Sequence, residues 1–148
     1  MNIGFTGTRK GLTAYQKDVI DKMFWVWSRL EPQEIKFHHG GCVGADAQAH
    51  LIATKYGMTT VIHPPTNDKH QAYVVPDELR DPKPYLDRNH DIVDDSDLLI
   101  ACPKSEVEIR RSGTWATVRY ARKVDKRLMI IPPEGGNSLP TLEGPRIT

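Results

Sequence analysis

Short apolar runs alternate with longer amphipathic segments along this chain, and this alternation limits its fold more than any other feature. Apolar runs of a few residues favour buried strands, whereas apolar residues repeated at spacings of three and four favour helices. Strands that alternate with helices are typical of a parallel sheet covered by helices, so we predict an α/β fold with five strands. The predicted strands are 2–6, 35–39, 58–62, 98–101 and 128–131, and the predicted helices are 14–30, 45–56, 85–95 and 113–124.

Local signals mark where several of these elements begin and end. Thr13 followed by Gln16 forms a capping box at the start of the first helix, and Gly57 marks the end of the second. The prolines between 63 and 84 predict a long loop with at most a short helix near 69–73. Long loops in compact domains often cover functional sites.

Length, charge and cysteine content exclude several classes of protein. We predict one domain over 1–132, followed by an irregular tail over 133–148 that is rich in Gly and Pro. A formal net charge of +1 excludes the broad basic field of a nonspecific nucleic-acid-binding protein, although it permits a local patch. Cys42 and Cys102 form no C-x-x-C pair, and the sequence shows neither a secretory leader nor a long apolar run. We therefore predict a cytoplasmic protein without a membrane segment.

Two short motifs at strand-to-helix junctions predict a site for phosphate or a nucleotide. Thr6-Gly7-Thr8-Arg9 follows the first strand, and Ser112-Gly113-Thr114-Trp115 precedes a helix. Small residues at such junctions let backbone N–H groups and hydroxyls approach a ligand, and Arg9 adds a positive charge.

Further motifs lie between these two, and the whole series has a familiar order. Gly40-Gly41-Cys42-Val43-Gly44-Ala45-Asp46 is followed by Ala49-His50, then by Arg88-Asn89, and Ser112-Gly113-Thr114 is followed by Thr117 and Ala121. The series resembles the SLOG superfamily, which includes DNA-processing protein A, the LOG phosphoribohydrolases and small YpsA-like proteins. The resemblance covers most of 2–132 and implies a Rossmann-like, doubly wound, mainly parallel sheet with helices on both faces.

The resemblance also implies a ligand class and a place for the ligand. Superfamily members bind nucleotides or nucleotide-derived molecules, and their usual strand order puts the first and fourth strands side by side, where doubly wound sheets bind ligands. Asp46 would then orient a ribose hydroxyl or cap its helix, and Arg88 would pair with a phosphate. The predicted ligand-binding residues are Gly7, Thr8, Arg9, Gly40, Gly41, Gly44, Asp46, Arg88, Asn89, Ser112, Gly113 and Thr114.

The same residues also have structural interpretations, which the sequence leaves open. Gly40-Gly41 suits a tight turn, Ser112 is a natural N-cap, and Arg88 suits a surface salt bridge. We predict neither a metal nor another cofactor, because the chain has no H-E-x-x-H or Cys-His set at zinc spacing. In addition, His38 and His39 should point to opposite faces of a strand.

Cleavage of a nucleotide N-glycosidic bond is the first alternative function. This reaction builds positive charge on the sugar and needs an attacking water, so a carboxylate should stabilise the charge or activate the water. LOG enzymes carry Pro-Gly-Gly-x-Gly-Thr-x-x-Glu, whereas here Ile109-Arg110-Arg111 replaces Pro-Gly-Gly and Thr117 stands where Glu would be. Asp46, Glu106 and Glu108 are the carboxylates that could replace this Glu, and Asp46 and Glu108 are the candidate catalytic residues.

A single-stranded nucleic-acid module is the second alternative. The resemblance to DNA-processing protein A favours it, as do the basic residues Arg110, Arg111, Arg119, Arg122 and Lys123. SLOG-like proteins often self-associate, and the surplus of aromatic residues on the first helix favours a homo-oligomer.

Overall fold

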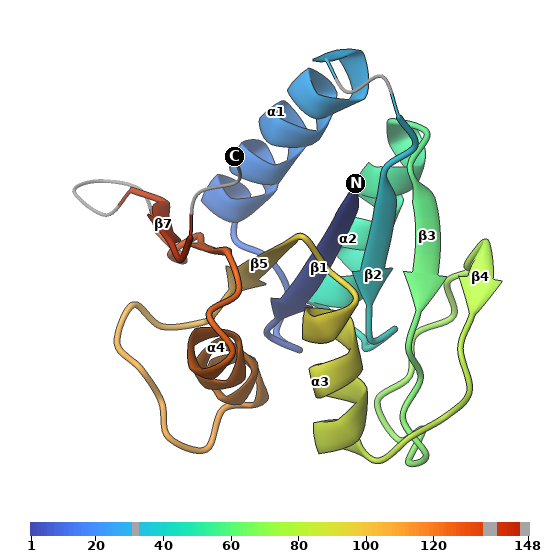
Figure 1. The fold of residues 1–148 in the computed structure, drawn as a ribbon, viewed down its shortest axis with the longest axis vertical. Helices are drawn as coiled ribbons and strands as arrows, with labels where there is room; N and C mark the ends of the chain where they lie inside the picture. The colour runs from blue at the N-terminus through green and yellow to red at the C-terminus, as the bar shows by residue number, and fades with distance from the viewer. Residues whose placement is uncertain (31–32, 135–138, 146–148) are drawn as a thin grey trace.

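The computed structural model describes residues 1–30, 33–134 and 139–145. These residues form four helices and one seven-stranded sheet (Figure 1). The helices are α1 (Ala14–Leu30), α2 (Ala45–Lys55), α3 (Tyr85–Asp94) and α4 (Gly113–Lys123). The strands are β1 (Asn2–Gly7), β2 (Lys36–His39), β3 (Thr59–Ile62), β4 (Glu78–Leu79), β5 (Leu98–Cys102), β6 (Leu128–Ile130) and β7 (Thr141–Glu143).

The strand order is β4-β3-β2-β1-β5-β6-β7, and every neighbouring pair is parallel except β6 and β7. The chain leaves β1 through α1 toward β2 on one side, and it leaves β5 through α4 toward β6 on the other. The predicted neighbourhood of the first and fourth predicted strands, which are β1 and β5, is therefore confirmed. The loops after these two strands diverge, which leaves space at their carboxyl ends.

The helices cover both faces of the sheet, as predicted. In β5, Leu98, Ile100 and Cys102 join one buried cluster, whereas Leu99 and Ala101 join another. The first cluster includes residues from α1 and α2, and the second includes residues from α3 and α4. Side chains alternate between the two faces along a strand, so the uninterrupted apolar run of β5 is what a strand buried on both faces requires.

Two short strands lie where we predicted none. β4 falls in the predicted loop 63–84 and pairs with the end of β3, and β7 falls in the predicted irregular tail and pairs with β6. Both are edge strands of two or three residues, which are too short to show an alternating pattern in the sequence. The other predicted tail residues at 135–138 and 146–148 lie outside the described residues.

The first helix packs on the sheet through one face. Ile20 and Phe24 are fully buried, and the ring of Trp27 lies 5.9 Å from that of Phe24, centroid to centroid. Trp25 points away from this face and is 46% exposed. No helix in the described ranges is both long and apolar enough to cross a membrane.

Candidate functional site

A cavity of about 920 Å³ opens at the carboxyl ends of β1 and β5. Its walls come from the loop after β1, the turn after β2, the segment 67–70, α3 and the loop that leads into α4. All the predicted ligand-binding residues except Gly41 and Gly44 line it. The fold therefore brings together motifs that lie more than a hundred positions apart in the sequence.

The loop after β1 is held by its own backbone. Thr8 N–H donates to the Cys102 carbonyl at 3.2 Å, which ties the loop to the end of β5. The Thr8 carbonyl accepts from Ala45 N–H at 3.0 Å, at the start of α2. The side chain of Arg9, the next residue, is exposed and lines the cavity.

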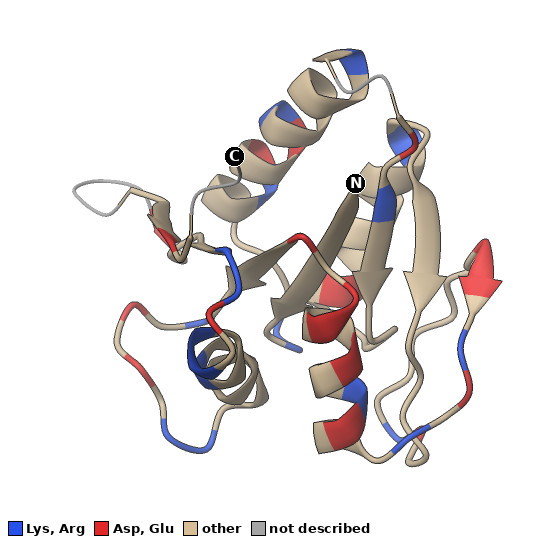
Figure 2. Cartoon of the chain, viewed as in Figure 1, with Lys and Arg blue, Asp and Glu red and all other residues tan. Residues whose placement is uncertain are grey.

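The cavity carries a strong excess of positive charge. Within the described part of the chain, Asp46 is the only carboxylate that lines it, and it is buried. Figure 2 shows both basic and acidic residues in the loop that leads into α4, and of the charged residues of this loop only Lys104 and Arg111 line the cavity. None of the cations of the lining forms an ion pair with another described residue. Arg88 is buried, and the exposed cations are Arg9, Lys10, Lys69, Lys104 and Arg111.

The start of α4 offers backbone donors to this cavity. Ser112 is the N-cap, and its Oγ accepts from Trp115 N–H at 3.3 Å. The N–H groups of Gly113 and Thr114 have no hydrogen-bond partner among the described residues. A Cβ atom at Gly113 would have no heavy atom within 4 Å. The first turn of a helix carries a partial positive charge, so this end suits an anion.

Asp46 holds the turn that follows β2. Its Oδ2 accepts from the N–H groups of Gly40 and Cys42, each at 3.2 Å. Burial raises the pKa of the Asp46 carboxyl to about 6, although these two hydrogen bonds and the nearby Arg88 act to lower it. Asp46 therefore holds the turn before α2 and does not cap the helix, since α2 has no side-chain cap. Asp46 also lines the cavity, which puts it within reach of a ligand.

Arg88 serves chiefly to tie loops together. The residue is only 5% exposed, and its Nη1 donates to the carbonyls of Gly40 at 2.9 Å and His63 at 3.0 Å. Its Nε donates to Asn89 Oδ1 at 2.8 Å, and Nη2 lies 3.9 Å from Cys42 Sγ. Oxygen atoms of the protein therefore accept from two of the three guanidinium nitrogens of Arg88, Nε and Nη1. The surface salt bridge considered from the sequence does not form among the described residues.

The remaining predicted site residues lie outside the cavity lining. Gly41 has φ +73°, and its carbonyl accepts from Ala72 N–H at 2.8 Å, which ties the turn to the loop between β3 and β4. Gly44 has φ +86° at the start of α2. Glu108 is exposed and forms ion pairs with Arg119 at 3.7 Å and Arg122 at 3.9 Å.

Sequence reasoning missed several residues of the lining. Lys69 and His70 belong to the predicted long loop 63–84, but nothing in that loop's sequence distinguishes the residues that face the cavity. Tyr85 begins α3 and donates its hydroxyl to the Asn67 carbonyl at 3.0 Å. Lys104 lies two positions after the end of β5, and this place at the carboxyl end of a predicted strand is a sequence signal that could have identified it.

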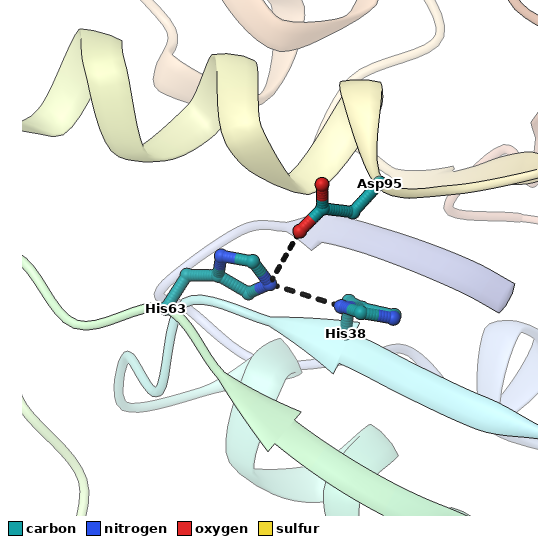
Figure 3. Close-up of side chains that lie close together, drawn as sticks. All are labelled: His38, His63 and Asp95. Carbon is teal, nitrogen blue, oxygen red and sulfur yellow. Dashed lines mark hydrogen bonds and ion pairs between the residues drawn. The ribbon is translucent and has the colours of Figure 1, made fainter. Parts of the chain in front are cut away.

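A second polar group lies apart from this cavity. His38 Nδ1 is 2.9 Å from His63 Nε2, and that nitrogen is 4.0 Å from Asp95 Oδ2 (Figure 3). These three groups could hold a metal ion, since their ligand atoms all lie within 4.8 Å of one another. On the other face of β2, His39 Nε2 lies 2.9 Å from His50 Nδ1. The predicted divergence of His38 and His39 is thus confirmed.

Comparisons with known proteins identify the fold. No family model and no curated protein matches the chain. The molybdenum cofactor binding protein from the phototrophic bacterium Rippkaea orientalis superposes with a TM-score of 0.68 at 21% identity, over 90% of this chain and 77% of that one. The structural genomics target TM1055 superposes with a TM-score of 0.62 at 14% identity, over 86% of this chain and 71% of that one. The chain is similar to these proteins in having a Rossmann-like α/β fold.

Proposed function

We propose that this protein binds a nucleotide or a nucleotide-derived ribose phosphate in the cavity between the loops after β1 and β5. The observation that carries the proposal is the set of exposed cavity cations without an ion-pair partner, defined above as Arg9, Lys10, Lys69, Lys104 and Arg111. These five positive charges surround one cavity, although the net charge of the whole chain is only +1. An anionic ligand supplies the partner that they lack.

The phosphate is expected at the start of α4. The unpartnered N–H groups of Gly113 and Thr114 would donate to it, and Arg111 would balance its charge. The aromatic and apolar part of the lining, which includes Tyr85, Leu86 and His70, offers surface for a base. A volume of about 920 Å³ is ample for a ligand of this size.

The similarity to a molybdenum cofactor binding protein adds a second ligand class to the test. The two proteins share the fold, and a fold of this kind hosts many ligands. We therefore place that cofactor beside the nucleotides in a ligand panel.

A thermal-shift panel tests the proposal. The panel contains nucleoside mono-, di- and triphosphates, ADP-ribose, cyclic nucleotides, ribose 5-phosphate, the molybdenum cofactor and a short single-stranded DNA. A ligand at about a hundred times its Kd should add about 2.7 kcal/mol to the free energy of unfolding. The absence of any shift with the phosphorylated compounds would contradict the proposal.

Charge variants locate the binding site. Arg9→Gln and Arg111→Gln should each weaken the best ligand about tenfold or more, because each removes a charge-assisted contact. Arg122→Gln is the matched control, since its guanidinium pairs with Glu108 and Glu143 outside the cavity. Equal losses in all three variants would point to a diffuse electrostatic effect. A DNA response that falls steeply with salt would instead favour the nucleic-acid module.

Hydrolysis of the N-glycosidic bond is a second candidate, and the raised pKa of Asp46 favours it. A carboxyl with a pKa of about 6 exchanges protons near neutral pH, and this one lines the cavity. Water would replace the base at the anomeric carbon, and the base would leave with a proton. Chromatography of each panel mixture detects free base, and Asp46→Asn should abolish its release.

A further inference from the structure

A cluster outside the cavity combines two buried imidazoles with one partly exposed carboxylate. His38 lies in β2, His63 directly follows β3, and Asp95 caps the end of α3. His38 is 1% exposed and His63 is 3% exposed, whereas the Asp95 side chain is 37% exposed. None of the three lines the large cavity. The cluster, drawn in Figure 3, is therefore a separate feature in which only the Asp95 side chain is partly exposed.

Asn2 fixes the orientation and the tautomer of His38. Its Oδ1 lies 2.9 Å from His38 Nε2, so it accepts the proton on that nitrogen. His38 Nδ1 then presents a lone pair toward His63. Histidines that bind metals commonly donate their other ring N–H to an oxygen in this way.

A metal ion would bind between His38 Nδ1 and His63 Nε2, where the two rings now make a short contact. His63 Nε2–H donates to His38 Nδ1 across 2.9 Å. Two nitrogen ligands of a tetrahedral zinc ion stand about 3.3 Å apart, given Zn–N bonds near 2.05 Å. If His63 carries its proton on Nδ1 instead, both lone pairs meet at one point after a small separation of the rings.

We propose that His38 Nδ1, His63 Nε2 and Asp95 Oδ2 form a binding site for a divalent transition-metal ion, with zinc as the best-suited ion. Two imidazoles and one carboxylate are ligands that zinc takes readily, whereas magnesium and calcium prefer oxygen alone. Three protein ligands leave one position for water or another small ligand. The exposed edge of Asp95 gives the ion access.

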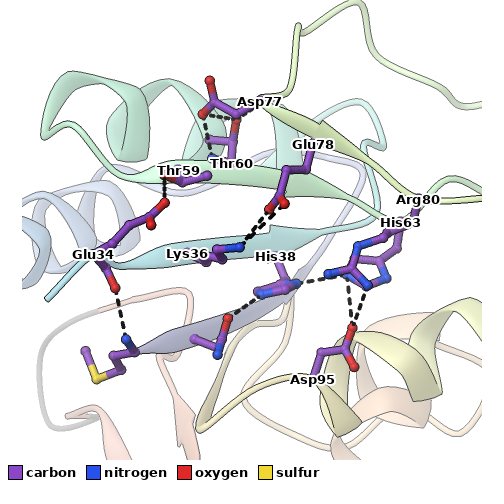
Figure 4. A network of polar contacts seen from close by, with 12 residues as sticks. Glu34, Lys36, His38, Thr59, Thr60, His63, Asp77, Glu78, Arg80 and Asp95 are labelled. Carbon is purple, nitrogen blue, oxygen red and sulfur yellow. Dashed lines mark hydrogen bonds and ion pairs between the residues drawn. The ribbon is translucent and has the colours of Figure 1, made fainter.

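Neighbouring charges set the affinity of this site. Arg80 Nη1 lies 3.4 Å from Asp95 Oδ2, so the guanidinium competes with an ion for that oxygen and also repels a cation (Figure 4). The Lys36–Glu78 ion pair lies beside the cluster and carries no net charge. Removal of the Arg80 charge should therefore strengthen metal binding, whereas removal of a ligand should weaken it.

Calorimetric titration of the full, tag-free chain with Zn²⁺ after treatment with a chelator tests the proposal. The wild-type chain should bind one equivalent, and bound Co²⁺ should show the visible absorption of a tetrahedral site. His63→Asn and Asp95→Asn should each weaken Zn²⁺ at least about tenfold, and Arg80→Gln should tighten it. His90→Asn, which removes a histidine stacked on Tyr120, is the matched control and should change nothing.

Asp95→Asn and Arg80→Gln keep the test decisive if His63→Asn fails to fold, because both alter partly exposed side chains. Circular dichroism verifies the fold of each variant. The proposal is overturned if the wild-type chain binds no equivalent of Zn²⁺. It is also overturned if the ligand variants bind as the wild type does. Neither outcome bears on the proposed nucleotide site, since that site is tested without metal.

Discussion

A Cβ atom at Gly40 would lie 2.4 Å from Nη1 of Arg88, in the space that the guanidinium occupies. The missing side chain lets Nη1 reach two carbonyls, one at the end of β2 and one at the end of β3. The two hydrogen bonds join those strand ends to α3, which forms a wall of the cavity. The glycine thus permits a structural tie, in addition to any approach of a ligand.

Gly40→Ala should lower the free energy of unfolding by about 2 kcal/mol, because the new methyl displaces a buried guanidinium from its hydrogen bonds. Denaturation in urea measures this loss. Gly113→Ala is the matched control, because a Cβ atom there meets nothing within 4 Å. The control should stay within about 0.5 kcal/mol of the wild type. Similar losses in both variants would contradict the assigned role of Gly40.

The architecture could be predicted because its signals are local and strong. The apolar run of β5 identifies a buried strand without any tertiary information. The neighbourhood of β1 and β5 needed the superfamily resemblance as well, because strand order depends on crossovers that no short window contains. Once that order is known, the loops after both strands must share an edge.

The roles of individual side chains could not be predicted in the same way. Arg88 looks like a phosphate ligand in the sequence, yet its nearest partners are carbonyls contributed by positions 40 and 63. Glu108 lies only four positions before Ser112, but its side chain pairs with cations of α4. His38, His63 and Asp95 come from three separate parts of the chain, so no sequence motif of fixed spacing predicts their cluster.

Asp46→Asn should change how stability depends on pH. The folded-state pKa is raised from its ordinary value of 3.8 to about 6, so the folded protein holds this proton more tightly than the unfolded chain does. Ionisation between about pH 4 and pH 7 therefore costs the wild type about 3 kcal/mol, a cost that asparagine avoids. Relative to the wild type, the variant should gain this amount between pH 4 and pH 8. Urea denaturation across that range measures it.

Asp68→Asn is the control for the Asp46 experiment, because it removes an exposed carboxylate from a loop. Its stability should follow that of the wild type across the same pH range. If the profile of Asp46→Asn also runs parallel to the wild type, the Asp46 carboxyl does not have a raised pKa. The second candidate function would then lose the observation that favours it.

Substitutions at Ser112 separate capping from ligand binding. Ser112→Ala should lower the free energy of unfolding by about 1 kcal/mol, whereas Ser112→Gly should lower it by only a few tenths. The hydroxyl accepts from Trp115 N–H, and glycine is tolerated at an N-cap far better than alanine. If the hydroxyl also contacts a ligand, both variants should weaken the best panel compound equally. If instead Ser112→Ala weakens the compound more than Ser112→Gly does, in the same order as their losses of stability, the hydroxyl acts only as a helix cap.

Gly44 and Gly57 allow the cost of a close backbone approach to be measured apart from the cost of a left-handed residue. Both have positive φ, +86° and +74°, but a Cβ atom at Gly44 would lie 2.2 Å from the Arg9 carbonyl oxygen, while one at Gly57 would meet nothing within 4 Å. Gly57→Ala should therefore cost about 1 kcal/mol, from backbone strain alone.

Gly44→Ala should cost at least about 2 kcal/mol more than Gly57→Ala, since the Arg9 backbone cannot move without breaking the bond from Ala45 N–H to Thr8. It should also weaken the best panel compound, because the loop after β1 would shift away from the cavity. Gly57 lies at the far end of α2, so Gly57→Ala should leave that affinity unchanged. If Gly44→Ala and Gly57→Ala cost the same stability, the loop after β1 moves easily to make room for the methyl group. The position of Arg9 would then not depend on a rigid loop.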